Sequence, residues 1–247
     1  MASRRSGSSR TLGAQAQDPS GPTTQVQATS TRAQMEKRKR GLALGLEADR
    51  ILLDAIRRED VPRLAEWFQD LSFLSLLSPG IVFPVSPEDE DAWFADMRSA
   101  RAAGRTYTFA IRLRTGELLG STSLMNVDGR NRSATFGIAI ADPAARGKHY
   151  GLEATELLLR YGFEELNLHR VQLFAFAFNG RAIAMYRRAG FRVEGRKRES
   201  LFRDGRYHDE IVMSILEEEY RSRPYAGTPF IPPDIRPLEP ESSDPAR

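Results

Sequence analysis

The residues best suited to chemistry in this chain form a short turn with two glycines and two cations, Arg146-Gly147-Lys148-His149-Tyr150-Gly151. The turn lies between an apolar, strand-like run, Phe136 to Ala141, and a strongly helical stretch, Leu152 to Leu166. The first N–H groups of a helix lack partners within the helix, and the helix dipole adds partial positive charge there. The pattern therefore predicts a site for a phosphate or pyrophosphate, and hence for a cofactor. An ordinary corner between a strand and a helix is the alternative interpretation.

The elements that must position this turn lie in the middle of a chain of 247 residues. Residues 1–46 are rich in Ser, Thr, Gln, Gly and Arg and contain almost no large apolar side chains, so burial cannot offset their ordering entropy. Residues 221–247 are rich in proline. We therefore expect a disordered basic arm over 1–46, one folded domain over 47–220 and a Pro-rich disordered tail over 221–247.

The residue patterns predict the element order β-α-α-β-β-β-α-β-α-β-β, which is typical of an α/β (α+β) domain with a mixed sheet and helices on its faces. Asp60 and Ser86 are expected to cap two helices at their N-termini, and Gly190 to end another. Segments 71–85 and 196–206 are expected to be loops. Strands are expected over 51–56, 106–112, 118–127, 133–141, 170–178, 191–195 and 206–216, and the two later helices over 152–166 and 181–188.

The composition excludes several kinds of protein. The chain has no cysteine, which rules out disulfides and thiolate chemistry, and its three histidines have no metal-ligand spacing, so no metal is expected. No leader peptide and no apolar run long enough to span a membrane is evident, which predicts a soluble, cytoplasmic protein. The basic run Lys37-Arg38-Lys39-Arg40 could contact nucleic acid, although such runs are more often solvated tails.

Two motifs together resemble a known family. The first is the run Gly137 to Pro143 followed by the glycine turn and Glu153-Ala154, and the second is the spaced set Asn179, Ala182, Tyr186, Gly190 and Phe191. Over about residues 48–219 the chain resembles the GNAT superfamily of acyl-CoA-dependent N-acetyltransferases. Within it, the chain is similar to the branch of ribosomal-protein serine and alanine N-terminal acetyltransferases and spermidine acetyltransferases. The resemblance implies a mostly antiparallel central sheet with helices on both faces and a splayed pair of central strands.

The resemblance also implies an activity and a co-substrate. The chain would be an acyltransferase that moves an acetyl group from acetyl-CoA to a primary amine by direct attack on the thioester. Backbone N–H groups of residues 146–151 would hold the CoA pyrophosphate, with Gly147 and Gly151 permitting close approach. The pantetheine arm would pair with an exposed strand edge, as an added strand does. That contact is implied for Ile138, Ile140 and the backbone near Ala141.

Two further residues match positions with roles in the family. Asn179 would hydrogen-bond the pantetheine through its amide, whereas its alternative interpretation is a turn residue before Gly180. Tyr186 matches the usual general acid, because a phenol with a reference pKa of about 10 can protonate or hydrogen-bond a developing thiolate. The alternative for Tyr186 is a buried aromatic of the helix over 181–188.

Two residues depart from the family pattern. His149 stands where the family prefers glycine, and a positive φ there would cost free energy, although histidine adopts it better than most residues. Thr135 stands near the position where many relatives carry a glutamate. The general base therefore stays open, and a chain of waters or an amine that arrives partly deprotonated would suffice.

The acceptor and the partners also stay open. A protein N-terminus or lysine is favoured by the resemblance, and a small-molecule amine such as a polyamine or an aminoglycoside-like antibiotic is the alternative. A polyamine needs an acidic pocket, which Glu88 to Asp91 could supply, although a charged helix start explains these residues more simply. The alternative function is a catalytically weak acyl-CoA-binding module that docks on RNA or the ribosome through its basic arm. A homodimer is compatible with the resemblance, but no residue decides it.

Overall fold

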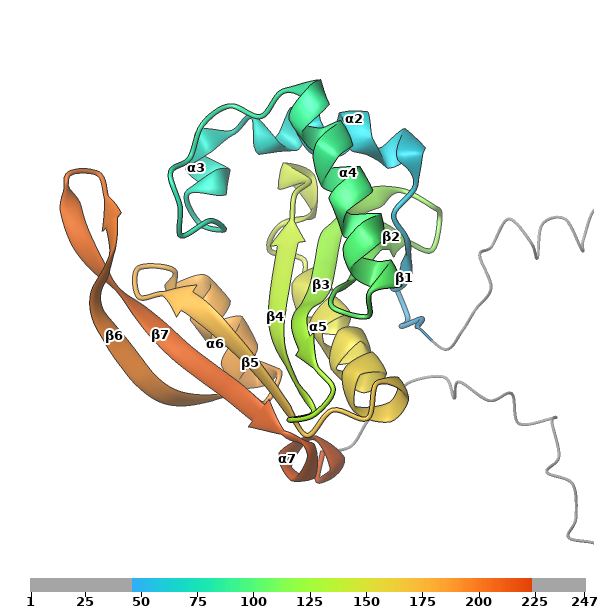
Figure 1. Ribbon diagram of the computed structural model, residues 1–247, viewed down its shortest axis with the longest axis vertical. Coiled ribbons are helices and arrows are strands. Elements are labelled where there is room, and N and C mark those ends of the chain that lie inside the picture. The colour runs from blue at the N-terminus through green and yellow to red at the C-terminus, as the bar shows by residue number, and fades with distance from the viewer. Residues whose placement is uncertain (1–45, 224–247) are drawn as a thin grey trace, which may run out of the picture. The chain divides into compact units, whose positions relative to one another are not determined.

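The computed structural model describes residues 46–223 (Figure 1). The basic run 37–40 and nearly all of the predicted arm and tail lie outside the described residues. Within the described part, Leu46 is already buried and belongs to the main hydrophobic core.

The described residues form one seven-stranded sheet in the order β1-β2-β3-β4-β5-β7-β6. Every neighbouring pair is antiparallel except β4 and β5, which are parallel. This confirms the predicted mixed, mostly antiparallel sheet. The strands are β1 (Ile51–Ala55), β2 (Tyr107–Leu113), β3 (Leu118–Asp128), β4 (Ser133–Ile140), β5 (Arg170–Phe176), β6 (Arg192–Arg203) and β7 (Arg206–Leu216).

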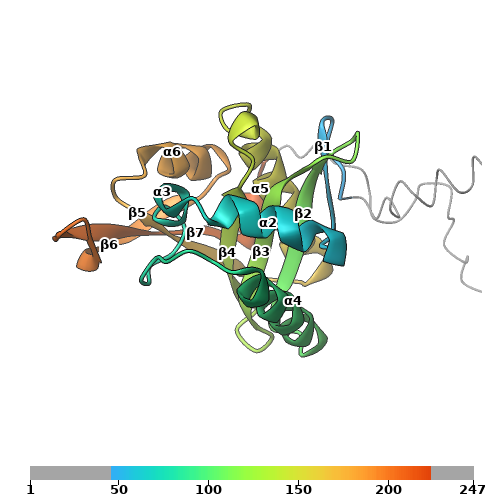
Figure 2. The same ribbon diagram turned by 90° about the horizontal axis from the view of Figure 1, so that it is seen from above.

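Helices lie on both faces of the sheet, as Figure 2 shows: α4 covers one face, and α5 and α6 cover the other. Helices α2 and α3 lie beyond the end at which β4 stops (Figure 1). The α-helices are α2 (Val61–Phe68), α3 (Leu71–Leu74), α4 (Pro87–Ala102), α5 (Tyr150–Arg160), α6 (Gly180–Arg188) and α7 (Glu217–Arg221). Single turns occur at η1 (Arg58–Asp60) and η2 (Pro143–Ala145), and the wider turn η3 (Tyr161–Glu165) extends α5.

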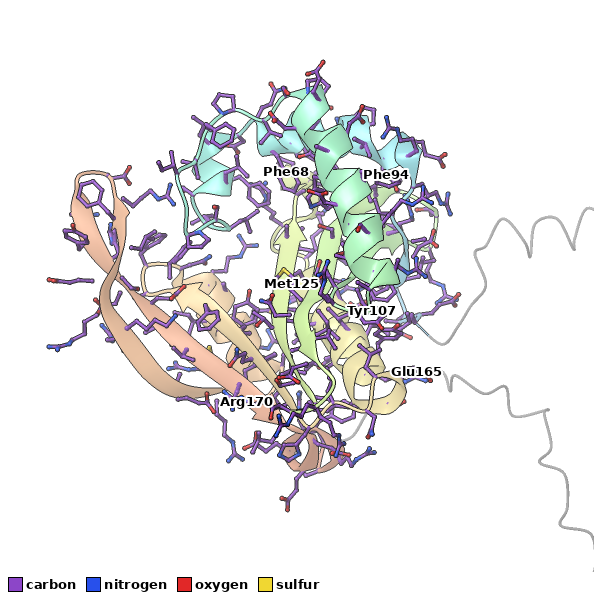
Figure 3. All side chains as sticks on the ribbon, viewed as in Figure 1. Phe68, Phe94, Tyr107, Met125, Glu165 and Arg170 are labelled. Carbon is purple, nitrogen blue, oxygen red and sulfur yellow. The ribbon has the colours of Figure 1, made fainter. Side chains whose placement is uncertain are left out.

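Strand β4 contributes to both hydrophobic cores because its side chains alternate between the two faces. Phe136, Ile138 and Ile140 pack into the larger core with α5 and α6. Ala139 and Ala141 pack into the smaller core, which also holds Phe68 of α2 and Phe94 of α4 (Figure 3). Because both faces of β4 are covered by other elements, most of its residues are apolar.

The central pair of strands splays as expected. β4 and β5 pair only at Ser133–Arg170, Ala134–Val171 and Thr135–Gln172. From Phe136 onward β4 keeps its partner β3 on one side but has no pairing with β5 on the other. A fork therefore opens between β4 and β5, and its β4 side is an unpaired strand edge inside the sheet.

Both predicted helix starts have the predicted positions, but only one of the two predicted side-chain caps forms. The Ser86 hydroxyl accepts from the Asp89 N–H at 3.2 Å, so it caps α4 as predicted. Asp60 precedes α2, but its carboxylate does not cap that helix. It accepts instead from the Arg57 N–H at 2.7 Å and from the buried Arg112 guanidinium at 2.5 Å. A partner 52 residues away in the sequence outcompetes the local cap.

The loop expected over 196–206 is wrong. Strand β6 continues to Arg203 and joins β7 through a tight turn in which Asp204 and Gly205 have φ of 51° and 74°. The charged residues of this segment lie on an edge strand that is largely exposed to solvent. Charged side chains are common on such edges because they discourage pairing with other chains.

Candidate active site

A cavity of about 340 Å³ lies where the fork meets the glycine turn. Its walls come from the end of β4, the start of α5, helix α6 and the segment around α3. Ala141 is fully buried in the smaller core, Lys148 is exposed, and neither lines the cavity. The residues predicted to bind the cofactor that do line it are Ile138, Ile140, Arg146, Gly147, His149, Tyr150, Gly151 and Asn179.

The glycine turn presents a run of unpaired backbone donors. The Arg146 N–H donates to Pro143 O at 3.3 Å, and the N–H groups of Leu152 and Glu153 donate to His149 O. Between them, the N–H groups of residues 147–151 have no acceptor among residues 46–223. Left-handed backbone at a turn makes successive N–H groups converge, and the start of α5 adds its dipole. The arrangement fits a pyrophosphate.

His149, which stands where the family prefers glycine, has a left-handed backbone conformation. His149 has φ 68° and ψ 6°, in the left-handed region, immediately before α5. Histidine is among the non-glycine residues that enter this region more readily. Its exposed ring lies beside α6, with Nδ1 3.5 Å from an Arg188 guanidinium nitrogen. The turn therefore forms despite the substitution.

Arg146 fastens the turn to its surroundings. Its guanidinium donates to Ile140 O at 3.0 Å and to Ala141 O at 2.8 Å, and its centre lies 4.0 Å from the centre of the Phe73 ring. Two donors are thereby committed to the end of β4 and one face to an aromatic ring. The side chain of Arg146 braces the turn, whereas its neighbours supply the free N–H groups.

Two cations that the sequence reasoning missed stand beside these donors. Arg181 and Arg188, both on α6, line the cavity. A Cβ added to Gly147 would lie 3.2 Å from an Arg181 guanidinium nitrogen, so the arginine reaches the turn itself. Positions seven apart on a helix share a face. That spacing within the predicted helix over 181–188 was the signal that could have identified the pair.

Asn179 caps helix α6 and also lines the cavity. It is the N-cap of α6, and its Oδ1 accepts from the Ala182 N–H at 3.1 Å. The same side chain lines the cavity. Because capping uses only the amide oxygen, the amide nitrogen keeps two hydrogens to donate to a ligand.

Tyr186 belongs to the core that borders the fork. Its side chain is nearly buried, and its ring packs edge-on against Phe136 and Phe191, with 5.9 Å between ring centres in each pair. Phe136 is the first residue of β4 beyond the paired positions, which places Tyr186 at the base of the fork. Burial raises the pKa of Tyr186 to about 12, so its hydroxyl stays protonated near neutral pH. No residue of the described part hydrogen-bonds that hydroxyl.

No unpaired carboxylate on β5 or β7 marks a general base. Both acidic residues of β7 are paired, Asp209 with Arg196 at 2.7 Å and Glu210 with Lys197 at 2.9 Å, and Glu194 of the neighbouring β6 pairs with Arg170. Thr135 lies on the side of β4 that Ala139 and Ala141 share, and carries no carboxylate. No group of His, Cys, Asp or Glu among residues 46–223 is arranged to hold a metal ion. None of the helices described has the length and apolar character that a membrane crossing requires.

Comparison with known proteins agrees with this geometry. Residues 50–192 match the family model described as an acetyltransferase (GNAT) domain. The chain belongs to the GNAT acetyltransferase family. It is an N-acetyltransferase that acts on amines with acetyl-CoA as co-substrate, as predicted.

The relatives differ in what they are named for. The "Putative ribosomal N-acetyltransferase YdaF" of Bacillus subtilis is 31% identical over 183 residues, covering 70% of this chain and 94% of that one. The spermidine N(1)-acetyltransferase of Escherichia coli K12 is 36% identical over 105 residues, covering 42% and 56%. A crystal structure of Vibrio cholerae spermidine N-acetyltransferase with CoA and spermine has a TM-score of 0.64 and 25% identity, covering 70% and 99%.

Proposed function

We propose that this chain acetylates the primary amine of a polypeptide, an N-terminus or a lysine, by direct attack of the amine on acetyl-CoA. The observation that carries the proposal is the run of unpaired N–H groups at 147–151, which shares one cavity with the free end of β4, while the core contact with Phe136 places the Tyr186 ring near the base of the fork. A phosphate site, a strand edge and a proton donor are what a thioester on a pantetheine arm requires.

The two ends of the acetyl-CoA molecule would be held by different means. The pyrophosphate accepts from the N–H groups of residues 147–151, while Arg181 and Arg188 add positive charge beside it. The amides of the pantetheine arm extend the sheet along β4 beyond Thr135, and the free amide nitrogen of Asn179 donates to one of its carbonyls. The arm thereby directs the thioester into the fork.

Tyr186 would act on the leaving group. As the amine nitrogen bonds to the carbonyl carbon, the carbon–sulfur bond breaks and the electron pair stays on sulfur. A hydrogen bond from the protonated hydroxyl stabilises that thiolate and can supply its proton. The amine, once acylated, would lose its extra proton to water, because the carboxylates of β7 and Glu194 of β6 are paired with cations.

A polypeptide acceptor is favoured over a polyamine by the state of the acidic helix start. Asp89 accepts from the Ser86 N–H at 2.9 Å, and Asp91 pairs with Arg58 at 2.9 Å. Glu90 is buried. Asp89 and Asp91 are thus engaged by the helix and its neighbour, and Glu90 is buried rather than facing an open pocket. The relative named for a ribosomal activity also matches over most of its length, whereas the Escherichia coli spermidine enzyme matches over about half.

The test is Tyr186→Phe, which removes only the hydroxyl. We expect kcat to fall by about 10²-fold or more with an N-terminal peptide as acceptor, because proton donation to the leaving group is lost. The dissociation constant for acetyl-CoA, measured by calorimetry, should stay within about twofold. Tyr161→Phe is the matched control, since Tyr161 is a half-buried tyrosine that packs on Tyr107 and Phe109 instead. Unchanged turnover in Tyr186→Phe would show that the assigned acid is wrong.

A further inference from the structure

The tip of the β6–β7 hairpin is tied to a segment that lies far from it in the sequence. The Arg203 guanidinium donates to Ser78 O at 2.9 Å and to Gly80 O at 3.2 Å. The guanidinium nitrogen therefore bonds the carbonyls on both sides of Pro79. The contact joins residues 125 positions apart, and charged donors make stronger hydrogen bonds than neutral ones.

Residues 71–80, which we call the α3 segment, are held at their other end by a second arginine. Phe73, buried in the smaller core, packs against the Arg146 guanidinium that braces the glycine turn. Asp70, the N-cap of α3, is stabilised in its charged form by hydrogen bonds from Ser72 and Phe73 and by Arg146, and all of these lower its pKa. One end of the segment thus contacts the cofactor turn and the other contacts the hairpin.

The α3 segment is itself a wall of the cofactor cavity. Phe73, Leu76 and Leu77 line the cavity opposite α6. The start of the segment is also held by apolar contacts, because Phe73 is buried in the smaller core and stacks on Phe68, and Leu77 packs against the same core. Leu76 and Gly80 are exposed, so the end of the segment depends more on Arg203.

The hairpin, in turn, is attached to the β5 side of the fork. His208 lies with Nε2 3.3 Å from Arg203 O, and its ring packs edge-on against Phe178 at 4.9 Å between centres. Phe178 stacks on Phe176, the last residue of β5. Contacts therefore run without a break from β5, through the hairpin and Arg203, to the wall of the cavity.

We propose that Arg203 is a positioning residue that holds the α3 segment as a wall of the cofactor cavity. This inference rests on the proposed function. Arg203 does not line the cofactor cavity, and would act by setting where Phe73, Leu76 and Leu77 stand against the pantetheine arm. The Nε–H of Arg203 is buried without an acceptor among the described residues, which offsets part of the gain from its two hydrogen bonds. The net stabilisation from the clamp is therefore smaller than its two hydrogen bonds alone would give.

The first experiment measures the wall directly in the full-length protein. In Arg203→Ala, we expect amide hydrogen exchange across residues 74–78 to speed up by about tenfold, since two hydrogen bonds that hold the segment closed are lost. The dissociation constant for CoA, measured by calorimetry, should rise about five- to tenfold. Arg206→Ala is the matched control, because Arg206 is exposed and faces Arg203 in the same hairpin without bonding the α3 segment.

Kinetics then separate positioning from a general loss of structure. Arg203→Ala should raise KM for acetyl-CoA about five- to tenfold while kcat stays within about twofold. Arg203→Lys should recover about half of the lost affinity, because an ammonium can still donate to a carbonyl of the turn. Unchanged exchange at 74–78, or faster exchange with unchanged CoA affinity, would overturn the inference. If no amine is acetylated by the unaltered protein, the proposed function fails, while exchange and CoA binding still test the clamp.

Discussion

Glu90 is the clearest pH-sensitive feature of the described structure. It lies on the first turn of α4, yet its residue surface is only 4% exposed. Its Oε2 is buried and has no hydrogen-bond partner in the described part of the chain. Burial, with a smaller contribution from Asp89, raises the pKa of the Glu90 carboxyl from 4.5 to about 7. The folded protein therefore holds this proton more tightly than the unfolded chain does.

The sign of the effect on stability follows from this difference. Between the two pKa values the folded state binds more protons than the unfolded state, so the free energy of unfolding falls as pH rises. With pKa values of 4.5 unfolded and about 7 folded, the contribution of Glu90 falls by about 2.5 kcal/mol between pH 5 and pH 8. Glu90→Gln keeps a neutral side chain of similar shape and removes this loss.

The assay is urea unfolding of the unaltered protein and Glu90→Gln at pH 5, 6, 7 and 8. We expect the two to be close in stability at pH 5 and the variant to be more stable by about 2.5 kcal/mol at pH 8. Glu88→Gln is the matched control, because Glu88 lies on the same helical turn but is exposed. The Glu88→Gln variant loses the same favourable interaction with the dipole of α4 as Glu90→Gln does. A Glu90→Gln difference that does not change with pH would refute the reasoning.

Two further predictions concern the glycine turn. Gly147→Ala places a Cβ on a residue with φ 85° and 3.2 Å from a guanidinium nitrogen of Arg181, so the turn must distort. Calorimetry should show CoA affinity reduced by about tenfold. An unchanged affinity would argue against this turn as the pyrophosphate site. His149→Gly relieves a left-handed non-glycine residue and should stabilise the protein by about 1 kcal/mol in thermal unfolding, with CoA affinity within twofold. A marked loss of affinity would instead show that the imidazole contacts the ligand.

Local chemistry made much of this architecture predictable. Strand β7 was expected with the bounds that the structure has, because its apolar alternation and flanking Asp204-Gly205 turn are encoded within a dozen residues. The helix start at Ser86 and the C-cap at Gly190, which has φ 95°, depend on single residues in the same way.

The missed features depend on contacts between distant residues. The full length of β6 comes from pairing with β7, which solvent-facing charges conceal in the sequence. The carboxylate of Asp60 is drawn from its helix by Arg112. The cavity wall combines Phe73 with Arg146, and neither residue signals the other. The glycine turn could be predicted because its donors are consecutive, whereas the cavity around it could not.

A cofactor site built from main-chain N–H groups makes demands on conformation rather than on residue identity. Every residue except proline carries that donor, so a position in 147–151 can change its side chain where the backbone keeps its path, but not Gly147, whose φ of 85° strains any side chain. His149 illustrates this freedom, since it takes the left-handed turn with an imidazole in place of a hydrogen. Some side-chain changes are thereby tolerated in the segment whose main-chain geometry we propose to be essential for binding the pyrophosphate. A similar fold is found in the Vibrio cholerae enzyme at only 25% identity.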